Sequence, residues 1–268
     1  MRRDRAFARW ADHAFLQHHI AAELVDRLDG VTRDFSRALI LGNGGVALRK
    51  ALEGRGIATM TVDAGLRFAA AEGGVQGDED RLPFRDASFD LVVSPGTLDT
   101  VNDLPGALAL VRRCLLPDGL LLAGFVGAGS LPVLRQAMLD ADMANGGARA
   151  RIHPQIDVRA AGDLLARAGF ALPVADSERL AVRYAHFPGL VADLRGSANT
   201  NLLGAAPLSR DAFAGASASF EAAAENGRTT EIFEIVFMTG WSPSPDQPIA
   251  ARRGSGTASL ADALRSKA

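Results

Sequence analysis

The chain has 268 residues, of which 48% are hydrophobic and 22% are charged, and its formal net charge is −2. This composition is typical of a globular protein that is long enough to bury a substantial core. The small net charge argues against non-specific binding to nucleic acid or to an anionic membrane. Because Cys114 is the only cysteine, the sequence excludes an intramolecular disulfide and a cysteine-cluster metal site.

The first 30 residues combine basic and apolar side chains without a continuous apolar core. They therefore lack the pattern of a secretory signal, and no later stretch reaches the roughly 18 apolar residues of a membrane span. We expect a cytoplasmic protein. Residues 5–28 predict an amphipathic helix, because apolar residues recur in them at roughly helical spacing: Phe7, Trp10, Phe15, Ile20, Leu24 and Leu28.

Apolar runs alternate with helical patterns over the first 130 residues. Buried strands are expected at 38–41, 57–62, 89–94 and 120–126. Helices are expected at 46–53 and from an N-cap at Asp103 to Leu116, because the Asp103 carboxylate can accept early backbone N–H groups. Strands and helices that alternate in this way predict βαβ units and a doubly wound, mostly parallel α/β sheet.

The second half is richer in helices. The patterns predict helices at 130–144, 157–168, 188–195 and 209–226, and strands at 178–184 and 232–241. We interpret residues 1–241 as one domain with an N-terminal helix, a cofactor-binding core at 37–130 and a substrate or cap region at 131–241. Residues 242–268 are rich in Pro, Gly, Ser and Arg, and we expect part of this tail to be disordered.

The segment "RALILGNGGVALRKAL" joins a predicted strand to a predicted helix through glycines at Gly42, Gly44 and Gly45. Such a turn can bring backbone N–H groups close to a nucleotide cofactor, and an acid at the end of the second strand can bind ribose hydroxyls. Asp63 follows Gly44 by 19 residues, near the spacing of the dinucleotide fingerprint. The segment does not match GxGxxG, so a tight turn without a ligand is the alternative.

An acidic loop, "GDEDRLPF", precedes the strand at 89–94 and carries Asp78, Glu79 and Asp80. In an open α/β sheet this loop lies at the carboxyl edge, where ligands bind. One of these acids could accept a hydrogen bond from an adenine amino group. The alternative is a solvated acidic turn.

The stretch "GDEDRLPFRDASFDLVVSPGTLDTVNDLPGALALVRRCLLPDGLLL" resembles the core of class I S-adenosylmethionine-dependent methyltransferases. It is most similar to the branch that holds the mitochondrial complex I assembly-factor 5 proteins and the malonyl-carrier-protein methyltransferase of biotin synthesis. Second-half segments such as "RIHPQIDVRAAGDLLARAGF", "VADLRGSANTN" and "FEIVFMTGW" favour the assembly factor. The resemblance covers nearly the whole chain and implies a seven-stranded sheet whose last strand is antiparallel.

The resemblance also implies a cofactor, S-adenosyl-L-methionine, and its contacts. Gly42 and Gly44 match the loop glycines, Asp63 matches the ribose acid, and Asp78, with Glu79 beside it, matches the adenine-side acid. The assembly-factor branch is associated with hydroxylation of an arginine on a complex I subunit. A complex I subunit or another protein substrate is therefore the expected partner.

Two positions depart from the family loop. Ile40 stands where the family has an acid, and Val46 stands where it has a third glycine. Loss of a hydrogen bond to a charged group typically costs about 1.5–3 kcal/mol, and a β-branched residue hinders close approach of the backbone. We expect weakened cofactor binding, and restoring both residues should strengthen it.

The other candidates are scattered. Asp99, His153 and Tyr184 are candidate substrate-lining residues, with surface or core placement as the alternative. No metal site is expected, because the histidines of the N-terminal helix lack an i, i+4 pair with carboxylate support.

Three functions remain open: a methyltransferase or arginine hydroxylase acting on a protein side chain, a catalytically degraded assembly chaperone, and a malonyl-carrier-protein methyltransferase. No catalytic residue is assigned, because methyl transfer depends mainly on positioning.

Overall fold

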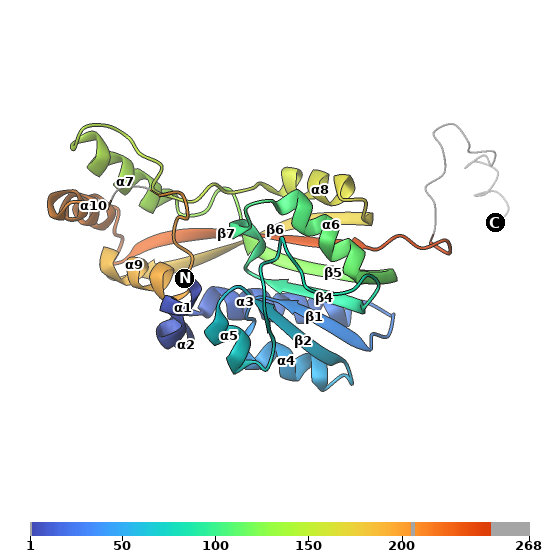
Figure 1. The fold of residues 1–268 in the computed structure, drawn as a ribbon. Helices are drawn as coiled ribbons and strands as arrows, with labels where there is room; N and C mark the ends of the chain where they lie inside the picture. Colours follow the sequence, from blue (N-terminus) through green and yellow to red (C-terminus); the bar gives the residue numbers. More distant parts are fainter. Residues whose placement is uncertain (1, 205–206, 248–268) are drawn as a thin grey trace, which may run out of the picture.

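A computed structural model describes residues 2–204 and 207–247 (Figure 1). Within these residues, seven strands form one sheet in the order β3-β2-β1-β4-β5-β7-β6. The strands are β1 (Arg37–Leu41), β2 (Ala58–Asp63), β3 (Val75–Gln76), β4 (Phe89–Pro95), β5 (Leu115–Val126), β6 (Ala171–Tyr184) and β7 (Thr229–Trp241). Strand β7 is antiparallel to β5 and β6, and the other neighbours pair in parallel. The predicted α/β fold with an antiparallel last strand is confirmed.

Helices cover both faces of this sheet (Figure 1). Helices α3 (Phe15–Asp29) and α4 (Gly45–Glu53) pack on one face, and α6 (Leu104–Cys114) and α8 (Val158–Arg167) pack on the other. Strand β1 shows why its sequence is continuously apolar: Ile40 contributes to the cluster under α3 and α4, whereas Leu39 and Leu41 contribute to the opposite cluster. A parallel strand covered on both faces has no solvent side for polar residues.

Most predicted elements are present with shifted ends. Helix α6 begins after Asp103, whose Oδ1 accepts a hydrogen bond from the Gly106 backbone N–H at 3.0 Å. Strand β5 begins five residues before its prediction and β6 begins seven residues before its own, because backbone pairing extends both strands. The short elements α5 (Leu66–Ala71) and β3 were not predicted.

The prediction of one continuous helix over 5–28 is wrong. The region divides into α1 (Arg2–Ala6), the 3₁₀-helix η1 (Phe7–Arg9), α2 (Trp10–His13) and α3. The sequence contains no proline or glycine before Gly30, so tertiary contacts account for the breaks. The Phe7 and Trp10 rings both pack edge-on against Phe68, with centroids 5.1 and 5.7 Å away. We call residues 2–13 the N-terminal segment.

Three helices of the second half, α7 (Pro132–Met143), α9 (Phe187–Gly196) and α10 (Arg210–Ala222), gather beyond one end of the sheet (Figure 1). They share a core that includes Leu134, Phe187, Leu190 and Phe220. The predicted disordered tail falls mostly on residues 248–268, which lie outside the described residues. Among the described residues, no helix combines the length and the apolar character needed to cross a membrane.

Candidate active site at the carboxyl edge of the sheet

The glycine turn after β1 lies beside the ends of β2 and β4. Gly42 donates its backbone N–H to the Val62 carbonyl at 2.8 Å and has a φ of +80°, which favours glycine. A Cβ at Gly42 would lie 2.2 Å from Cγ2 of Thr97. At Gly44, a Cβ would lie 2.8 Å from the Pro95 ring. Contacts within the protein therefore already require both glycines.

The two residues that depart from the family loop have opposite environments. Ile40 is 3% exposed and belongs to the apolar cluster under α3 and α4. Val46 is 51% exposed in the first turn of α4. A residue exchange at these two positions therefore affects the core at Ile40 and the surface at Val46.

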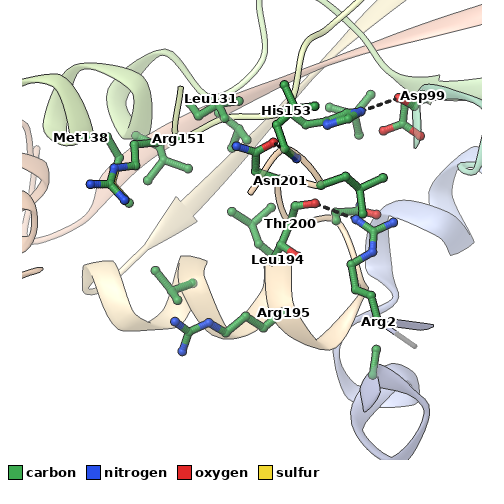
Figure 2. A pocket seen from close by; sticks show the side chains of 18 of the residues that line it. Arg2, Asp99, Leu131, Met138, Arg151, His153, Leu194, Arg195, Thr200 and Asn201 are labelled. Atoms are coloured by element: carbon green, nitrogen blue, oxygen red, sulfur yellow. Dashed lines mark hydrogen bonds between the residues drawn. The ribbon is translucent and has the colours of Figure 1, made fainter. Parts of the chain in front are cut away.

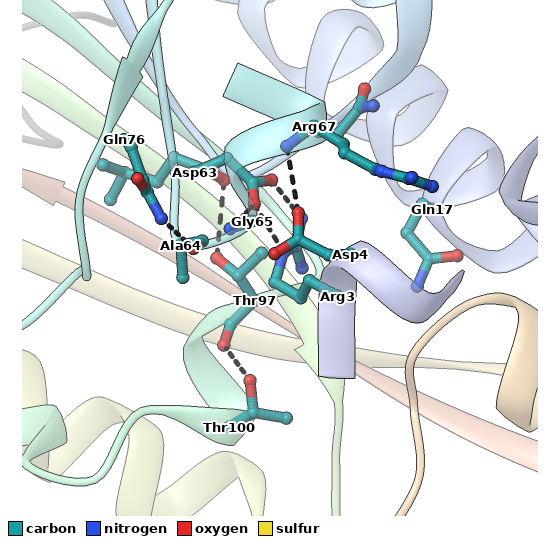
Figure 3. A network of polar contacts seen from close by, with 12 residues as sticks. Arg3, Asp4, Gln17, Asp63, Ala64, Gly65, Arg67, Gln76, Thr97 and Thr100 are labelled. Carbon is teal, nitrogen blue, oxygen red and sulfur yellow. Dashed lines mark hydrogen bonds and ion pairs between the residues drawn. The ribbon is translucent and has the colours of Figure 1, made fainter. Parts of the chain in front are cut away.

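Asp63, at the end of β2, is fully buried and is held by Arg3 of the N-terminal segment (Figure 3). Arg3 Nε donates to Oδ1 at 2.7 Å, and a second guanidinium nitrogen pairs with Oδ2. The Gly65 backbone N–H also donates to Oδ1, at 2.7 Å. Both carboxylate oxygens thus have partners within the chain. The basic start "MRRDRA" is the one feature of the sequence that relates to this contact.

The carboxylates of the acidic loop after β3 differ in their exposure to solvent. Asp78 is exposed, whereas Glu79 is 9% exposed. Burial raises the pKa of Glu79, and the Arg3 guanidinium works in the opposite direction. Both acids line a cavity of about 380 Å³ with Thr100, Val101 and Asn102. Glu79 is therefore the acid of this loop that faces the interior.

A larger cavity, of about 730 Å³, lies between the sheet edge and the second-half helices (Figure 2). Its apolar wall comes from β5, α7, β7 and the loop before α7, and it includes Val126, Leu131, Leu134 and Phe233. Arg5, Arg9 and Arg195 also line it and are exposed. The cavity thus combines an apolar wall with cationic groups that solvent reaches.

Asp99 and His153, two predicted substrate-lining residues, meet in the wall of this cavity (Figure 2). His153 Nε2 lies 3.1 Å from the Asp99 backbone oxygen. The Asp99 Oδ1 atom and the His153 Nδ1 atom are buried without a hydrogen-bond partner in the described structure. Burial raises the pKa of Asp99 to about 7, against the opposing effect of the Arg2 guanidinium. Unsatisfied buried polar atoms are rare in native proteins and point to a missing partner.

Tyr184, the third predicted substrate-lining residue, lies elsewhere. It is 7% exposed within the core of the second-half helices and does not line either cavity described above. Burial raises the pKa of its phenol. Tyr184 thus takes the core placement that was the alternative in the sequence, because a residue at the end of a strand can face the core as readily as a cleft.

The histidines of the N-terminal region also differ from expectation. His19 and Glu23 are an i, i+4 pair on α3, and Glu178 of β6 lies next to them. Their ligand-capable atoms all lie within 4.8 Å of one another, and His19 Nε2 is 3.3 Å from Glu178 Oε1. The expectation that these histidines lack carboxylate support is therefore wrong.

Comparison with known proteins agrees with this architecture. A family model described as a methyltransferase domain matches residues 39–123. The arginine-hydroxylase NDUFAF5 of Danio rerio is 32% identical over 261 residues, covering 92% of this chain and 81% of the relative. The human protein of the same name is also 32% identical, with 92% and 76% coverage. The malonyl-[acyl-carrier protein] O-methyltransferase of Laribacter hongkongensis is 30% identical, with 90% and 87% coverage.

A solved structure shows the same fold. The YcgJ protein of Bacillus subtilis aligns with a TM-score of 0.58 at 17% sequence identity, covering 85% of this chain and 99% of that protein. The chain belongs to the class I S-adenosylmethionine-dependent methyltransferases. Within them it falls in the branch of the arginine-hydroxylase NDUFAF5 and the malonyl-[acyl-carrier protein] O-methyltransferases.

In the described conformation, the acid expected to contact the ribose of S-adenosylmethionine already has partners within the chain. An acid at the end of the second strand is the residue type that binds ribose hydroxyls. In this chain the Asp63 oxygens accept from Arg3 and Gly65, and a Cβ at Gly65 would lie 3.0 Å from the Arg3 Cβ. Arg3 and Gly65 thus use three of the roughly four acceptor positions of the carboxylate that a ribose would contact.

Proposed function

We propose that this chain is an S-adenosylmethionine-dependent enzyme that modifies a basic side chain of a protein, acts in the cytoplasm and contributes to the assembly of respiratory complex I. The observation that carries the proposal is the buried, unpartnered Oδ1 of Asp99 in the wall of the larger cavity. A guanidinium or ammonium group would give this atom the charge-assisted hydrogen bond that it lacks. Similarity to arginine hydroxylases over 92% of the chain supports the choice of arginine.

The pKa of Asp99 determines at which pH its carboxylate can bind a cationic side chain. Because burial raises it to about 7, the carboxylate is only partly ionised near neutral pH. A cationic side chain favours the ionised form, so binding should strengthen as the pH rises through about 7. His153 contributes by holding the Asp99 backbone, with its Nε2 3.1 Å from the carbonyl oxygen.

The test uses the purified chain, S-adenosylmethionine and complex I subunits, with mass spectrometry of each subunit. We expect a modified arginine, and the added mass distinguishes a methyl group from an oxygen atom. Asp99→Asn should abolish most of the modification, whereas Asp12→Asn, at an exposed carboxylate, should not. Equal activity of the two variants would remove Asp99 from the site.

A second candidate function is methylation of a malonyl thioester on a carrier protein. It is favoured by the exposed guanidinium groups of Arg5, Arg9 and Arg195, which line the cavity. Guanidinium groups match carboxylates and phosphates. The test measures methyl transfer to a malonyl carrier protein. If Arg195→Gln weakens this transfer and Asp99→Asn leaves it intact, the second function is favoured over the first.

A third candidate is an assembly chaperone that no longer uses the cofactor. The self-paired Asp63 and the buried Ile40 favour it. Calorimetry with millimolar S-adenosylmethionine separates the candidates: the chaperone predicts no heat and no thermal shift, together with retained capture of a complex I subunit. Measurable binding of the cofactor would contradict the chaperone.

A further inference from the structure

The N-terminal segment crosses the carboxyl edge of the sheet, and its Arg3 lies against Asp63, the acid expected to contact the ribose (Figure 3). Its Arg3 forms the two-pronged contact with Asp63, and the same guanidinium lies 5.1 Å from the centroid of the Phe68 ring. The Arg3 side chain is 16% exposed and that of Asp63 is 0% exposed. The Arg3–Asp63 ion pair is therefore buried, unlike an ion pair between two solvent-exposed side chains.

Contacts on both sides of Arg3 hold the segment in place. Asp4 Oδ1 accepts a hydrogen bond from the Arg67 backbone N–H at 2.9 Å, at the start of α5 (Figure 3). On the other side, Arg2 donates to the Thr200 carbonyl at 2.6 Å (Figure 2). The segment therefore joins the first βα units to the loop after α9.

The contacts of Arg3 conflict with those of the cofactor. A ribose that binds Asp63 through both oxygens competes with Arg3 for them, because Arg3 and Gly65 already use three of the roughly four acceptor positions of the carboxylate. Resting on the use of S-adenosylmethionine in the proposed function, we propose that the N-terminal segment is a displaceable strap: Arg3 occupies the ribose position of the free protein and leaves when the cofactor binds.

The strap also links the cofactor site to the larger cavity. Arg2, Arg5, Ala6 and Arg9 belong to the segment and line that cavity. Release of Arg3 would move the residues beside it in the chain, so cofactor binding changes the wall against which a substrate rests. Two sites that share one movable element are energetically coupled, and each ligand then changes the affinity for the other.

Trp10 provides a reporter that does not depend on altering Arg3. The chain has two tryptophans, Trp10 in the segment and Trp241 in β7, so Trp241→Phe leaves Trp10 as the only indole. In the free protein Trp10 is 9% exposed and packs on Phe68. Saturating S-adenosylmethionine should increase quenching of Trp10 by acrylamide. Saturation without a change in quenching would overturn the strap.

Affinity gives the second readout. Arg3→Lys keeps the charge but loses the two-pronged contact, and Arg3→Met also loses the charge. Calorimetry should show tighter binding of S-adenosylmethionine in both, by about tenfold if the open form is about a tenth of the free protein. Arg159→Lys and Arg159→Met, at an exposed position of α8 outside the N-terminal segment and both cavities, should bind as the original chain does.

The outcomes separate the strap from the cofactor assignment. Weaker binding in the Arg3 variants would make Arg3 a cofactor ligand and overturn the strap. Unchanged binding would make the Arg3–Asp63 pair a permanent structural contact and also overturn it, while cofactor use stands. No heat in any variant would overturn the strap and cofactor use together. Arg3→Lys and the Trp10 measurement keep the test valid if Arg3→Met does not fold.

Discussion

Two sites lie along the carboxyl edge of the same sheet, and they differ in how their polar groups are satisfied. At the end of β2, the Asp63 carboxylate is fully buried and both of its oxygens have partners in the chain. In the larger cavity, Asp99 Oδ1 and His153 Nδ1 are buried without a hydrogen-bond partner among the described residues. The first site must release a contact before it binds a ligand, whereas the second gains one.

This difference has an energetic consequence. Removal of one partner of a fully paired buried carboxylate leaves an uncompensated buried charge, which is strongly destabilising. An unpaired buried carboxylate disfavours the folded state and is relieved by a ligand that donates to it. Stability measurements can therefore test the comparison without any substrate.

The largest expected effect follows from breaking the paired site. Asp63→Asn should lower the free energy of unfolding by about 3–5 kcal/mol, as removal of one partner of a buried ion pair typically does. Urea unfolding measures this change. Asp29→Asn is the matched control, because Asp29 is 60% exposed in its pair with Arg55 and should cost about 0–1 kcal/mol. Equal effects of the two substitutions would contradict a buried, fully paired Asp63.

A change at Ile40 tests the other side of the glycine turn. Ile40→Asp should lower the free energy of unfolding by about 3 kcal/mol or more, because it removes core packing and buries a carboxyl group. The structure thus adds a stability cost to the restoration of the family acid. Val46→Asp is the control: Val46 is exposed at the start of α4, where an acid is favourable. Comparable thermal melts for both variants would contradict the buried position of Ile40.

A pH series tests the unpaired site. The folded pKa of Asp99, about 7, is above the usual value of about 3.9 in an unfolded chain. The folded state therefore binds the proton more tightly, and the contribution of Asp99 to stability falls as the pH rises from about 4 to about 7. Relative to the original chain, Asp99→Asn should gain at most roughly 1.4 kcal/mol for each pH unit in this window.

Urea unfolding at several pH values measures the Asp99 effect, and Asp12→Asn, at an exposed site, should show no such trend. A difference between Asp99→Asn and the original chain that stays constant from pH 4 to pH 7 would mean that Asp99 titrates as an ordinary carboxylate.

The smallest effect is expected at the exposed loop residue. Val46→Gly should change the free energy of unfolding by about 1 kcal/mol or less, as glycine does in an exposed helical position. Ala47→Gly, at the adjacent exposed position, controls for the helix penalty. If Val46 hinders the cofactor, calorimetry should show tighter binding of S-adenosylmethionine in Val46→Gly alone. Equal affinities would show that Val46 does not limit binding.

Part of the fold could be predicted because the signals are local. The apolar runs around Leu39 and Val92 lie in strands covered on both faces, so their burial is visible in the sequence. Asp103 begins a helix as predicted, because an N-cap needs only neighbouring backbone groups. Strand β3 has two residues and α5 has six. Elements this short give too few turns or alternations for a periodic pattern.

The candidate site was predicted less completely. The sequence placed Asp63, Glu79 and Asp99 at strand ends or in the loops between elements, and the sheet brings them to one edge. The conformation of the 78–80 loop decides which of its acids faces inward. The packing of the second-half helices decides that the Tyr184 side chain is buried in their core. The role of Arg3 rests on its contact with Asp63, which lies 60 positions away in the chain. No local sequence pattern reveals such a contact.

The sequence by itself determined the α/β class and the family, because both rest on patterns within short windows or on motifs read directly from residues, and the resemblance to the family implied the antiparallel last strand. Only the tertiary structure decided that Arg3 holds Asp63 and that, within residues 2–204 and 207–247, Asp99 Oδ1 has no hydrogen-bond partner. The physical reason is that hydrogen-bond satisfaction at a buried site is a property of the groups that the fold brings together, and these groups come from distant parts of the chain.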